Sequence, residues 1–184
     1  IGLSDKVLGI IGLGNIGKEL VKLSSPFFKN IIAYDPYLSD EEIINRGATK
    51  VGLSDLAKES DFVVIGASIR YGDHRKNLYE FVDQNKDLLD EKDNAFFSVN
   101  AVARKEDKNT ANTNPYITKF LRKSKWRPKK IEVFAGRIDY PKYNAFDKYM
   151  IRFIMWITSG PTNMNESYEF TNWNQVKKFA QEIS

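Results

Sequence analysis

The sequence predicts an α/β fold: a doubly wound parallel sheet with helices on both faces, in a three-layer α/β/α sandwich. Short apolar runs alternate with helix-like segments along the chain, which is the pattern of a parallel sheet covered by helices. A glycine-rich turn, GLGNIG at residues 12–17, joins the first apolar run to the first helix-like segment. The chain of 184 residues has the usual length of one domain, so we expect a single domain over residues 1–184.

Six apolar runs are short enough to be strands and are bounded by turn residues or charges. The expected strands are residues 6–12, 30–35, 49–52, 61–68, 94–100 and 130–136.

The segments between the expected strands carry helix signals. Ser39, with Glu42 three residues later, forms a capping box that opens the second helix. Apolar residues recur on one face over 78–89, and Asp73 is the expected N-cap of that helix. The last helix is expected over residues 172–183.

Composition excludes several classes of site. The absence of cysteine excludes disulfides, cysteine-based metal sites and thiol catalysis, and it fits a reducing cytoplasm. No apolar run approaches the roughly 20 residues that span a bilayer. His74 is the only histidine, and we expect it on the surface; no metal site is expected. Because residue 1 is isoleucine, we expect a fragment or a processed product.

Basic residues exceed acidic ones only after residue 60, and they crowd residues 119–130. This basic stretch is either a solvated helix face or a contact for an anionic membrane or polyanion. Nucleic acid is not expected as a partner, because no recognition motif accompanies the charge.

The GLGNIG turn is a dinucleotide-binding fingerprint in its required context, directly after a strand and directly before a helix. Gly12 permits the tight turn, Gly14 lets a pyrophosphate approach the backbone, and Gly17 lets the helix pack on the sheet. Asp35 lies 21 residues beyond Gly14, where a carboxylate accepts hydrogen bonds from an adenosine ribose and repels a 2′-phosphate. NAD is therefore expected over NADP. The cofactor-binding residues expected here are Gly12, Gly14, Asn15, Ile16, Gly17, Asp35 and Pro36.

Residues 3–65 resemble the cofactor domain of the D-2-hydroxyacid dehydrogenases, on the segments LSDKVLGIIGLGNIGKELVKL, IIAYDPYLSDEE and LSDLAKESDFVVI. The resemblance implies NAD binding. It ends where those enzymes carry a His-Val-Pro-Leu type segment, because this chain reads GASIRYGD there. Their catalytic arginine, glutamate and late histidine have no counterpart, so no catalytic residue is expected.

The chain from about Asp61 onwards resembles the flavodoxin-like, quinone-dependent protoporphyrinogen oxidases. The segments are VVIGASIRYGDH, AFFSVNAVARK, TNPYITKFLRKSKWRP, YPKYNAFDKYMIRFIM and NWNQVKKFAQEI. The resemblance implies FMN between the loops 67–72 and 99–105, and it implies a family insertion at 101–128. GLGNIG stands where that family has a Ser/Thr-rich phosphate loop. The contacts implied for the flavin ring are Ser68, Arg70, Tyr71, Gly72 and Asn100.

The segment 143–158 has more apolar residues than one core face requires. It is either a buried connection or a helix facing a membrane surface or a partner, flanked by Lys142, Lys148 and Arg152.

The two resemblances indicate a join near residues 60–66, with a Rossmann-type part at 1–65 and a flavodoxin-like part at 66–184. Strands of both parts combine into the order 3-2-1-4-5-6, and a cofactor would lie at the switch point. Our first hypothesis is an engineered chimera that binds NAD without efficient catalysis. The alternatives are an FMN-dependent oxidoreductase of the protoporphyrinogen oxidase type and a scaffold without ligand. The sequence does not decide the oligomeric state.

Overall fold

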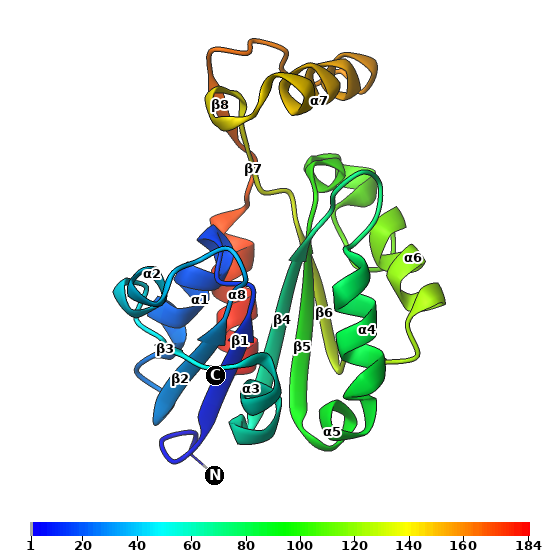
Figure 1. Ribbon diagram of the computed structural model, residues 1–184. Coiled ribbons are helices and arrows are strands. Elements are labelled where there is room, and N and C mark those ends of the chain that lie inside the picture. The colour runs from blue at the N-terminus through cyan, green and yellow to red at the C-terminus, as the bar shows by residue number, and fades with distance from the viewer. Residues whose placement is uncertain (1) are drawn as a thin grey trace.

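One parallel sheet organises the computed structural model, which describes residues 2–184 (Figure 1). Ile1 lies outside the described residues. Six strands of this range pair in the order β3-β2-β1-β4-β5-β6, and every pair is parallel. The expected fold class and strand order are therefore confirmed. The strands are β1 Val7–Ile11, β2 Asn30–Tyr34, β3 Thr49–Lys50, β4 Phe62–Ser68, β5 Asp93–Val99 and β6 Lys130–Phe134.

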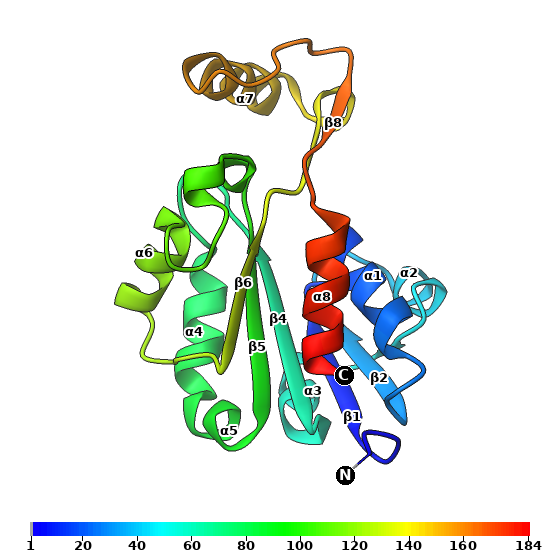
Figure 2. The same cartoon turned by 180° about the vertical axis from the view of Figure 1, so that it is seen from behind.

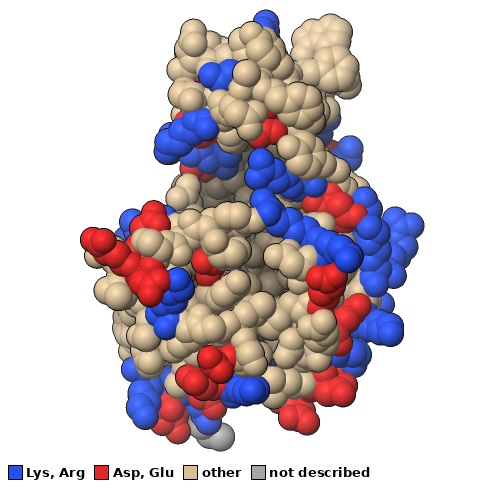
Figure 3. Space-filling model, viewed as in Figure 1, with Lys and Arg blue, Asp and Glu red and all other residues tan. Residues whose placement is uncertain are grey.

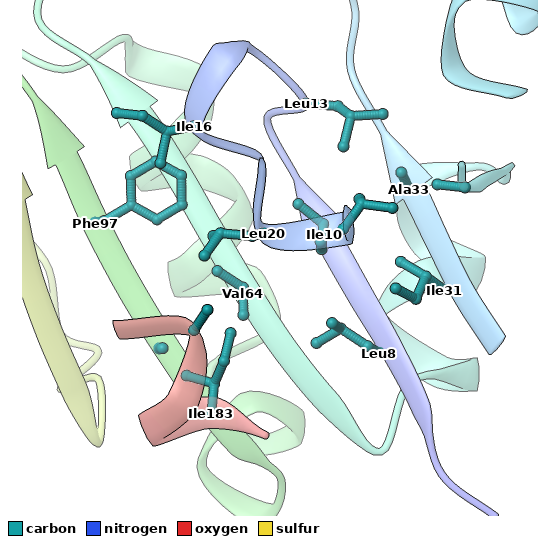
Figure 4. Close-up of a cluster of buried hydrophobic side chains, with 14 of the residues drawn as sticks. Leu8, Ile10, Leu13, Ile16, Leu20, Ile31, Ala33, Val64, Phe97 and Ile183 are labelled. Carbon is teal, nitrogen blue, oxygen red and sulfur yellow. The ribbon is translucent and has the colours of Figure 1, made fainter. Parts of the chain in front are cut away.

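Alternate residues of each strand enter two separate cores, because successive side chains of a strand point to opposite faces. In β4, Val64 lies in the first core, whereas Val63 and Ile65 lie in the second. In β5, Phe97 lies in the first core and Phe96 lies in the second. Figure 4 shows the first core, in which side chains of α1 and of the C-terminal helix meet those of the central strands. Both faces of the sheet are thus buried, as a parallel sheet requires.

Helices cover the two faces of this sheet (Figures 1 and 2). The first core takes buried side chains from α1, α2 and α8, and the second takes them from α3, α4, α5 and α6. The three-layer sandwich is the result. The helices are α1 Asn15–Ser24, α2 Asp40–Asn45, α3 Leu53–Glu59, α4 Lys76–Gln84, α5 Lys86–Glu91, α6 Pro115–Lys123 and α8 Trp173–Ile183.

Of the two helix caps predicted from the sequence, one is observed and the other is not. The capping box of α2 is confirmed: the Ser39 hydroxyl accepts from the Glu42 amide, and the Glu42 carboxylate accepts from the Ser39 amide. The prediction of Asp73 as a helix N-cap is wrong, because α4 begins at Lys76. The Asp73 carboxylate instead accepts a hydrogen bond from the Tyr79 hydroxyl at 2.8 Å.

Residues 101–128, expected as an insertion, contribute to the second helical layer. They contain two 3₁₀ helices, η1 Ala101–Arg104 and η2 Glu106–Lys108, followed by α6. Ile117 and Phe120 of α6 are fully buried in the second core.

The part that stands apart from the three layers is residues 137–170, which we call the α7 unit. It consists of β7 Arg137–Asp139, η3 Tyr140–Lys142, α7 Ala145–Ile157 and β8 Ser167–Glu169. Strands β7 and β8 pair antiparallel, and Figures 1 and 2 place the unit beyond the carboxyl ends of the parallel strands. A small third core of Ile138, Tyr140 and Met155 holds it together. Strands β7 and β8 were not predicted from the sequence, because strands of three residues are too short to carry a periodic pattern.

Candidate functional site

A cavity of about 370 Å³ lies at the carboxyl ends of β1 and β4, where the strand order reverses direction. Ligands of open α/β sheets bind at such switch points. Its walls come from the loops after β1, β2, β4 and β6 and from α4. Figure 3 shows a hollow between the sheet layers and the α7 unit, with Lys and Arg side chains along its rim.

The glycine-rich loop forms the floor of this cavity. Gly12 has a φ of +88°, and a Cβ atom there would lie 2.3 Å from the Gly66 carbonyl oxygen of β4. At Gly17 a Cβ atom would lie 2.4 Å from the Gly12 carbonyl oxygen. Glycine is therefore required at both positions by the close approach of loop, strand and helix.

Gly14 differs from the other two loop glycines. A Cβ atom at this position would meet nothing within 4 Å in the part of the chain that the structure describes. Gly14 is the N-cap of α1, and no described side chain caps the helix, so the first-turn amides face the cavity unblocked. Free amides at a helix N-terminus bind anions, and the residues present therefore fit a phosphate group.

Asp35, the expected ribose acceptor, lines the cavity but already accepts two backbone hydrogen bonds. Its carboxylate accepts from the Leu13 amide at 2.8 Å and from the Tyr37 amide at 2.9 Å. Burial raises the pKa of Asp35, while the Leu13 hydrogen bond and the nearby Arg46 oppose this rise. The Arg46 guanidinium also donates to the Leu13 carbonyl, so Asp35 and Arg46 together fix the start of the loop.

Most of the predicted site residues meet in this cavity. Those that line it are Gly12, Gly14, Asn15, Ile16, Gly17, Asp35, Pro36 and Ser68. Arg70 and Tyr71 lie beside it, in a shallow surface hollow shared with Arg75, Lys76 and Asn77. Gly72 forms a left-handed turn, and its carbonyl accepts from the Lys119 ammonium at 2.9 Å.

Asn100 lies apart from the cavity lining. Its side chain is buried, donates to the Ser98 hydroxyl at 3.2 Å and accepts from the Ala103 amide at 3.2 Å. These bonds fix the turn after β5.

Several residues of the cavity wall were not predicted from the sequence. Tyr37 and Arg75 stand at its mouth, where the guanidinium lies 4.7 Å from the ring centre. Leu78 and Phe81 of α4 give one wall its apolar character. Arg137 and Glu169 come from the α7 unit, which brings residues far apart in the sequence to the same cavity. One signal in the sequence pointed to this wall: Arg75 directly follows YGDH, the end of a segment that resembles the protoporphyrinogen oxidases.

His74 contradicts the expectation of a surface histidine, because only 4% of it is exposed. Its Nε2 atom lies 3.0 Å from the Ser98 hydroxyl, and its ring packs edge-on against Phe96 and Phe120. Burial lowers the pKa of His74 to about 4. Apolar residues around the start of α4 thus enclose the imidazole as a neutral side chain.

The neighbouring Asp73 is held as a carboxylate. Burial raises its pKa, but hydrogen bonds from Lys123, Tyr79 and Lys119 outweigh burial and keep the pKa far below its usual value. The Lys119 ammonium lies 3.0 Å from the Asp73 carboxylate. Asp73 therefore ties the loop after β4 to α6. Within residues 2–184, no group of three or more metal-ligating side chains is placed to hold a metal ion.

Two protein families match overlapping parts of the chain. The flavodoxin domain matches residues 42–165, and the NAD-binding domain of the D-isomer specific 2-hydroxyacid dehydrogenases matches residues 1–80. Both resemblances noted from the sequence are confirmed.

Individual relatives also fall into two groups, one of protoporphyrinogen IX dehydrogenases and one of D-2-hydroxyacid dehydrogenase type. The protoporphyrinogen IX dehydrogenase [quinone] of Escherichia coli (strain K12) is 46% identical over 124 residues, which cover 67% of this chain and 68% of that protein. The Leishmania major protein of the same name is 44% identical over 135 residues, 73% of this chain and 58% of that protein. The D-3-phosphoglycerate dehydrogenase of Methanocaldococcus jannaschii is 42% identical over 66 residues, which are 35% of this chain but 13% of that enzyme.

Among solved structures, the PH0520 protein from Pyrococcus horikoshii OT3 covers 81% of this chain with a TM-score of 0.47 and 18% identity. This chain spans 40% of that protein. The D-lactate dehydrogenase from Salmonella matches this chain with a TM-score of 0.42 and 22% identity, and this chain spans 28% of that enzyme.

These relatives overturn one prediction from the sequence. We expected an engineered chimera that binds NAD without efficient catalysis, and this expectation is wrong. The proteins that are 44–46% identical over 67–73% of the chain are named as enzymes. The error came from counting missing dehydrogenase residues, although two thirds of the chain follows the other family. The flavodoxin match over residues 42–165 covers more than half of the sequence, and the chain therefore belongs to the flavodoxin domain family.

Proposed function

We propose that the protein is an oxidoreductase that removes hydrogen from a porphyrinogen and passes the electrons to a quinone, with FMN in the cavity at the ends of β1 and β4. The observation that carries the proposal is the 46% identity to the Escherichia coli protoporphyrinogen IX dehydrogenase [quinone] over 67% of the chain. The cavity geometry supports it, because a phosphate site and an apolar wall lie in one cleft.

The first-turn amides of α1 would hold the FMN phosphate. They are uncapped within the described residues, and the open space at Gly14 leaves room for an anion. This loop replaces hydroxyl donors with backbone amides and the helix dipole, which favour the same charge.

The wall that would receive the flavin ring is formed by Ser68, Phe97 and Val99 on the strand ends and by Leu78 and Phe81 of α4. When bound, FMN would supply a carrier that takes two electrons from one substrate and passes them to another. Apolar walls exclude water from such a ring and strengthen the electrostatic interactions around it.

Cations at the mouth of the cavity suit a porphyrinogen, whose side chains include carboxylates. Arg70, Arg75 and Lys76 share the hollow beside the cavity, and Arg75 lines both. A guanidinium binds a carboxylate with two parallel hydrogen bonds. These side chains would orient the substrate with its ring toward the cavity.

NAD is the second candidate for the cofactor, and one observation favours it. The cavity continues past the phosphate loop to Pro36, Tyr37 and Leu53 on the β2 side. A dinucleotide would place its adenosine there. Asp35 would then accept from the ribose in addition to its two backbone donors, which the lone pairs of a carboxylate allow.

The test begins with the purified protein stripped of ligand. Calorimetric titrations with FMN and with NAD are compared for the wild type and for Asp35→Asn, whose amide oxygen can still accept from the Leu13 amide and hold the loop. Anaerobic oxidation of protoporphyrinogen is then followed by porphyrin fluorescence, with a quinone as acceptor. We expect saturable FMN binding that Asp35→Asn leaves largely intact, and quinone-dependent porphyrin formation. Porphyrin formation that proceeds equally without protein or without quinone would refute the proposed activity. NAD binding that Asp35→Asn weakens would replace FMN by the second candidate.

A further inference from the structure

The outward face of α7 is a continuous apolar surface. Its large apolar side chains expose between 45% and 70% of their area: Phe146, Tyr149, Phe153, Ile154, Trp156 and Ile157. These residues recur every three or four positions and therefore share one helix face. Contiguous exposed patches of this kind mark interaction sites, whereas scattered surface apolar residues do not.

The opposite face of α7 is firmly attached to the rest of the protein. Asp147, which is buried, accepts from the Arg70 guanidinium and from the Tyr71 hydroxyl, each at 3.2 Å. Met155 is buried in the third core, and Ile151 packs against that core. The attached residues recur every four positions, at 147, 151 and 155. The helix therefore cannot turn its apolar face inward without breaking these contacts.

The charges of α7 identify what fits this face. The one acidic residue of the helix, Asp147, points inward to Arg70. The remaining charges are Lys148 and Arg152, one turn apart and adjacent to Tyr149 and Trp156 on the helix surface. The surface that α7 presents to its surroundings is thus apolar with a cationic border that includes aromatic residues.

We infer that α7 docks the protein on the surface of an anionic lipid bilayer, with the helix axis in the plane of the interface. Interfacial helices combine an apolar face with Lys and Arg on the polar side, and Trp and Tyr prefer the headgroup level. No helix within residues 2–184 has the length and hydropathy to cross a membrane. The exposure of this face contradicts the buried connection, which was one of the two alternatives for residues 143–158.

A second copy of the chain fits this face less well. Two copies related by a two-fold axis would bring the same patch against itself. With the two-fold axis perpendicular to the helix, Lys148 and Arg152 of both copies would lie at one border, where like charges repel. An anionic lipid surface pairs with these cations instead.

Docking would place the cavity close to the bilayer. Arg137 and Glu169 of the α7 unit line the cavity, and the Arg70–Asp147 ion pair joins α7 to the loop after β4. Figure 3 shows the hollow directly below the α7 unit. Under the proposed function, an apolar quinone would reach the cavity from the lipid phase.

The test is sedimentation of the whole protein with vesicles of phosphatidylcholine alone and with phosphatidylglycerol added. We expect saturable binding that is tighter on the anionic vesicles. Phe153→Ser with Trp156→Ser should weaken it at least about tenfold, because these side chains supply buried apolar area. Lys148→Gln with Arg152→Gln should weaken it roughly 30-fold on the anionic vesicles alone.

Matched controls come from exposed residues far from α7. Phe27→Ser removes an aromatic side chain that is 53% exposed, and Lys29→Gln with Lys177→Gln removes two exposed cations. Both controls should bind as the wild type does. Wild-type protein that stays in the supernatant with either vesicle, or binding that survives Phe153→Ser with Trp156→Ser, would overturn the inference.

A second readout identifies the docked residue and is independent of activity. Brominated lipids should quench part of the tryptophan fluorescence, and Trp156→Phe should abolish most of that quenching, because Trp126 is fully buried and Trp173 packs against the first core. Quenching that persists in Trp156→Phe would contradict docking through α7. A wild-type dimer in solution that Phe153→Ser with Trp156→Ser converts to a monomer would assign the face to a second copy instead. Docking without porphyrinogen oxidation would refute the proposed function and leave this inference standing.

Discussion

The guanidinium of Arg75 stacks 4.7 Å from the ring centre of Tyr37, across the mouth of the cavity. Tyr37 follows β2, in a segment matched only by the dehydrogenase domain, whereas Arg75 precedes α4 and is matched by the flavodoxin domain as well. The contact thus joins the two sides of the cleft above the expected cofactor position.

Arg75→Ala should weaken substrate binding with little change in stability. An exposed cation–π pair contributes about 0.5–1 kcal/mol, so the free energy of unfolding should fall by no more than that. Loss of a charge-assisted hydrogen bond should raise the KM for the porphyrinogen about tenfold. Steady-state kinetics and urea unfolding check both effects. Lys177→Ala serves as the control, and an unchanged KM in Arg75→Ala would remove this residue from the substrate site.

Gly14→Ala and Gly17→Ala should separate binding from stability. At Gly14 a methyl group meets no described atom within 4 Å, so the protein should fold normally while the cofactor phosphate is obstructed. At Gly17 the methyl group would lie 2.4 Å from the Gly12 carbonyl oxygen, so the loop must distort. Calorimetric titration should show weaker cofactor binding for Gly14→Ala, and thermal unfolding should show a lower Tm for Gly17→Ala. A lower Tm in Gly14→Ala, with cofactor affinity retained, would contradict the phosphate site.

His74 should make the protein less stable in mild acid. Its pKa is about 4 in the folded protein, against an ordinary value of 6.5, so the unfolded chain binds the extra proton first. The stabilisation is complete above pH 6.5 and is lost as the pH falls from 6.5 toward 4, by up to about 3 kcal/mol. Urea unfolding at several pH values measures this loss.

The control for that experiment is His74→Gln, which cannot be protonated in this range. We expect a lower free energy of unfolding at pH 7, because the buried ring is lost, together with a flatter dependence on pH between 6.5 and 4. An equally steep dependence in this variant would mean that other groups account for the loss of stability in acid.

Asp147→Ala should loosen the α7 unit without affecting the sheet. The substitution removes the acceptor of Arg70, Tyr71 and Asn144 at the base of α7. Loss of these partners costs about 1–3 kcal/mol, so amides of residues 145–157 should exchange roughly tenfold faster or more. Hydrogen exchange followed by mass spectrometry measures this, with residues 62–68 of β4 as the internal reference. Faster exchange in β4 as well would show that the unit and the sheet unfold together.

The strand order and the position of the glycine-rich turn could be predicted from the sequence. Strands of a parallel sheet are buried on both faces and appear as short apolar runs, as in Phe62–Ser68. The requirement for glycine at residues 12 and 17 is local, because a strand that turns directly into a helix leaves no room for a side chain. The capping box at Ser39 and Glu42 is local in the same sense.

Only the tertiary structure decided the environment of His74, the engagement of Asp35 and the direction of the apolar face of α7. A periodic pattern identifies residues that share a face, but it contains no information about what covers that face. Burial of His74 depends on Phe96 and Phe120, and the Asp35 carboxylate meets the Leu13 amide only when β1 and β2 pair. The outward face of α7 is set by the contact of Asp147 with Arg70, 77 residues earlier in the chain. Such long-range contacts arise from the packing of whole elements, so no local segment of the sequence specifies them.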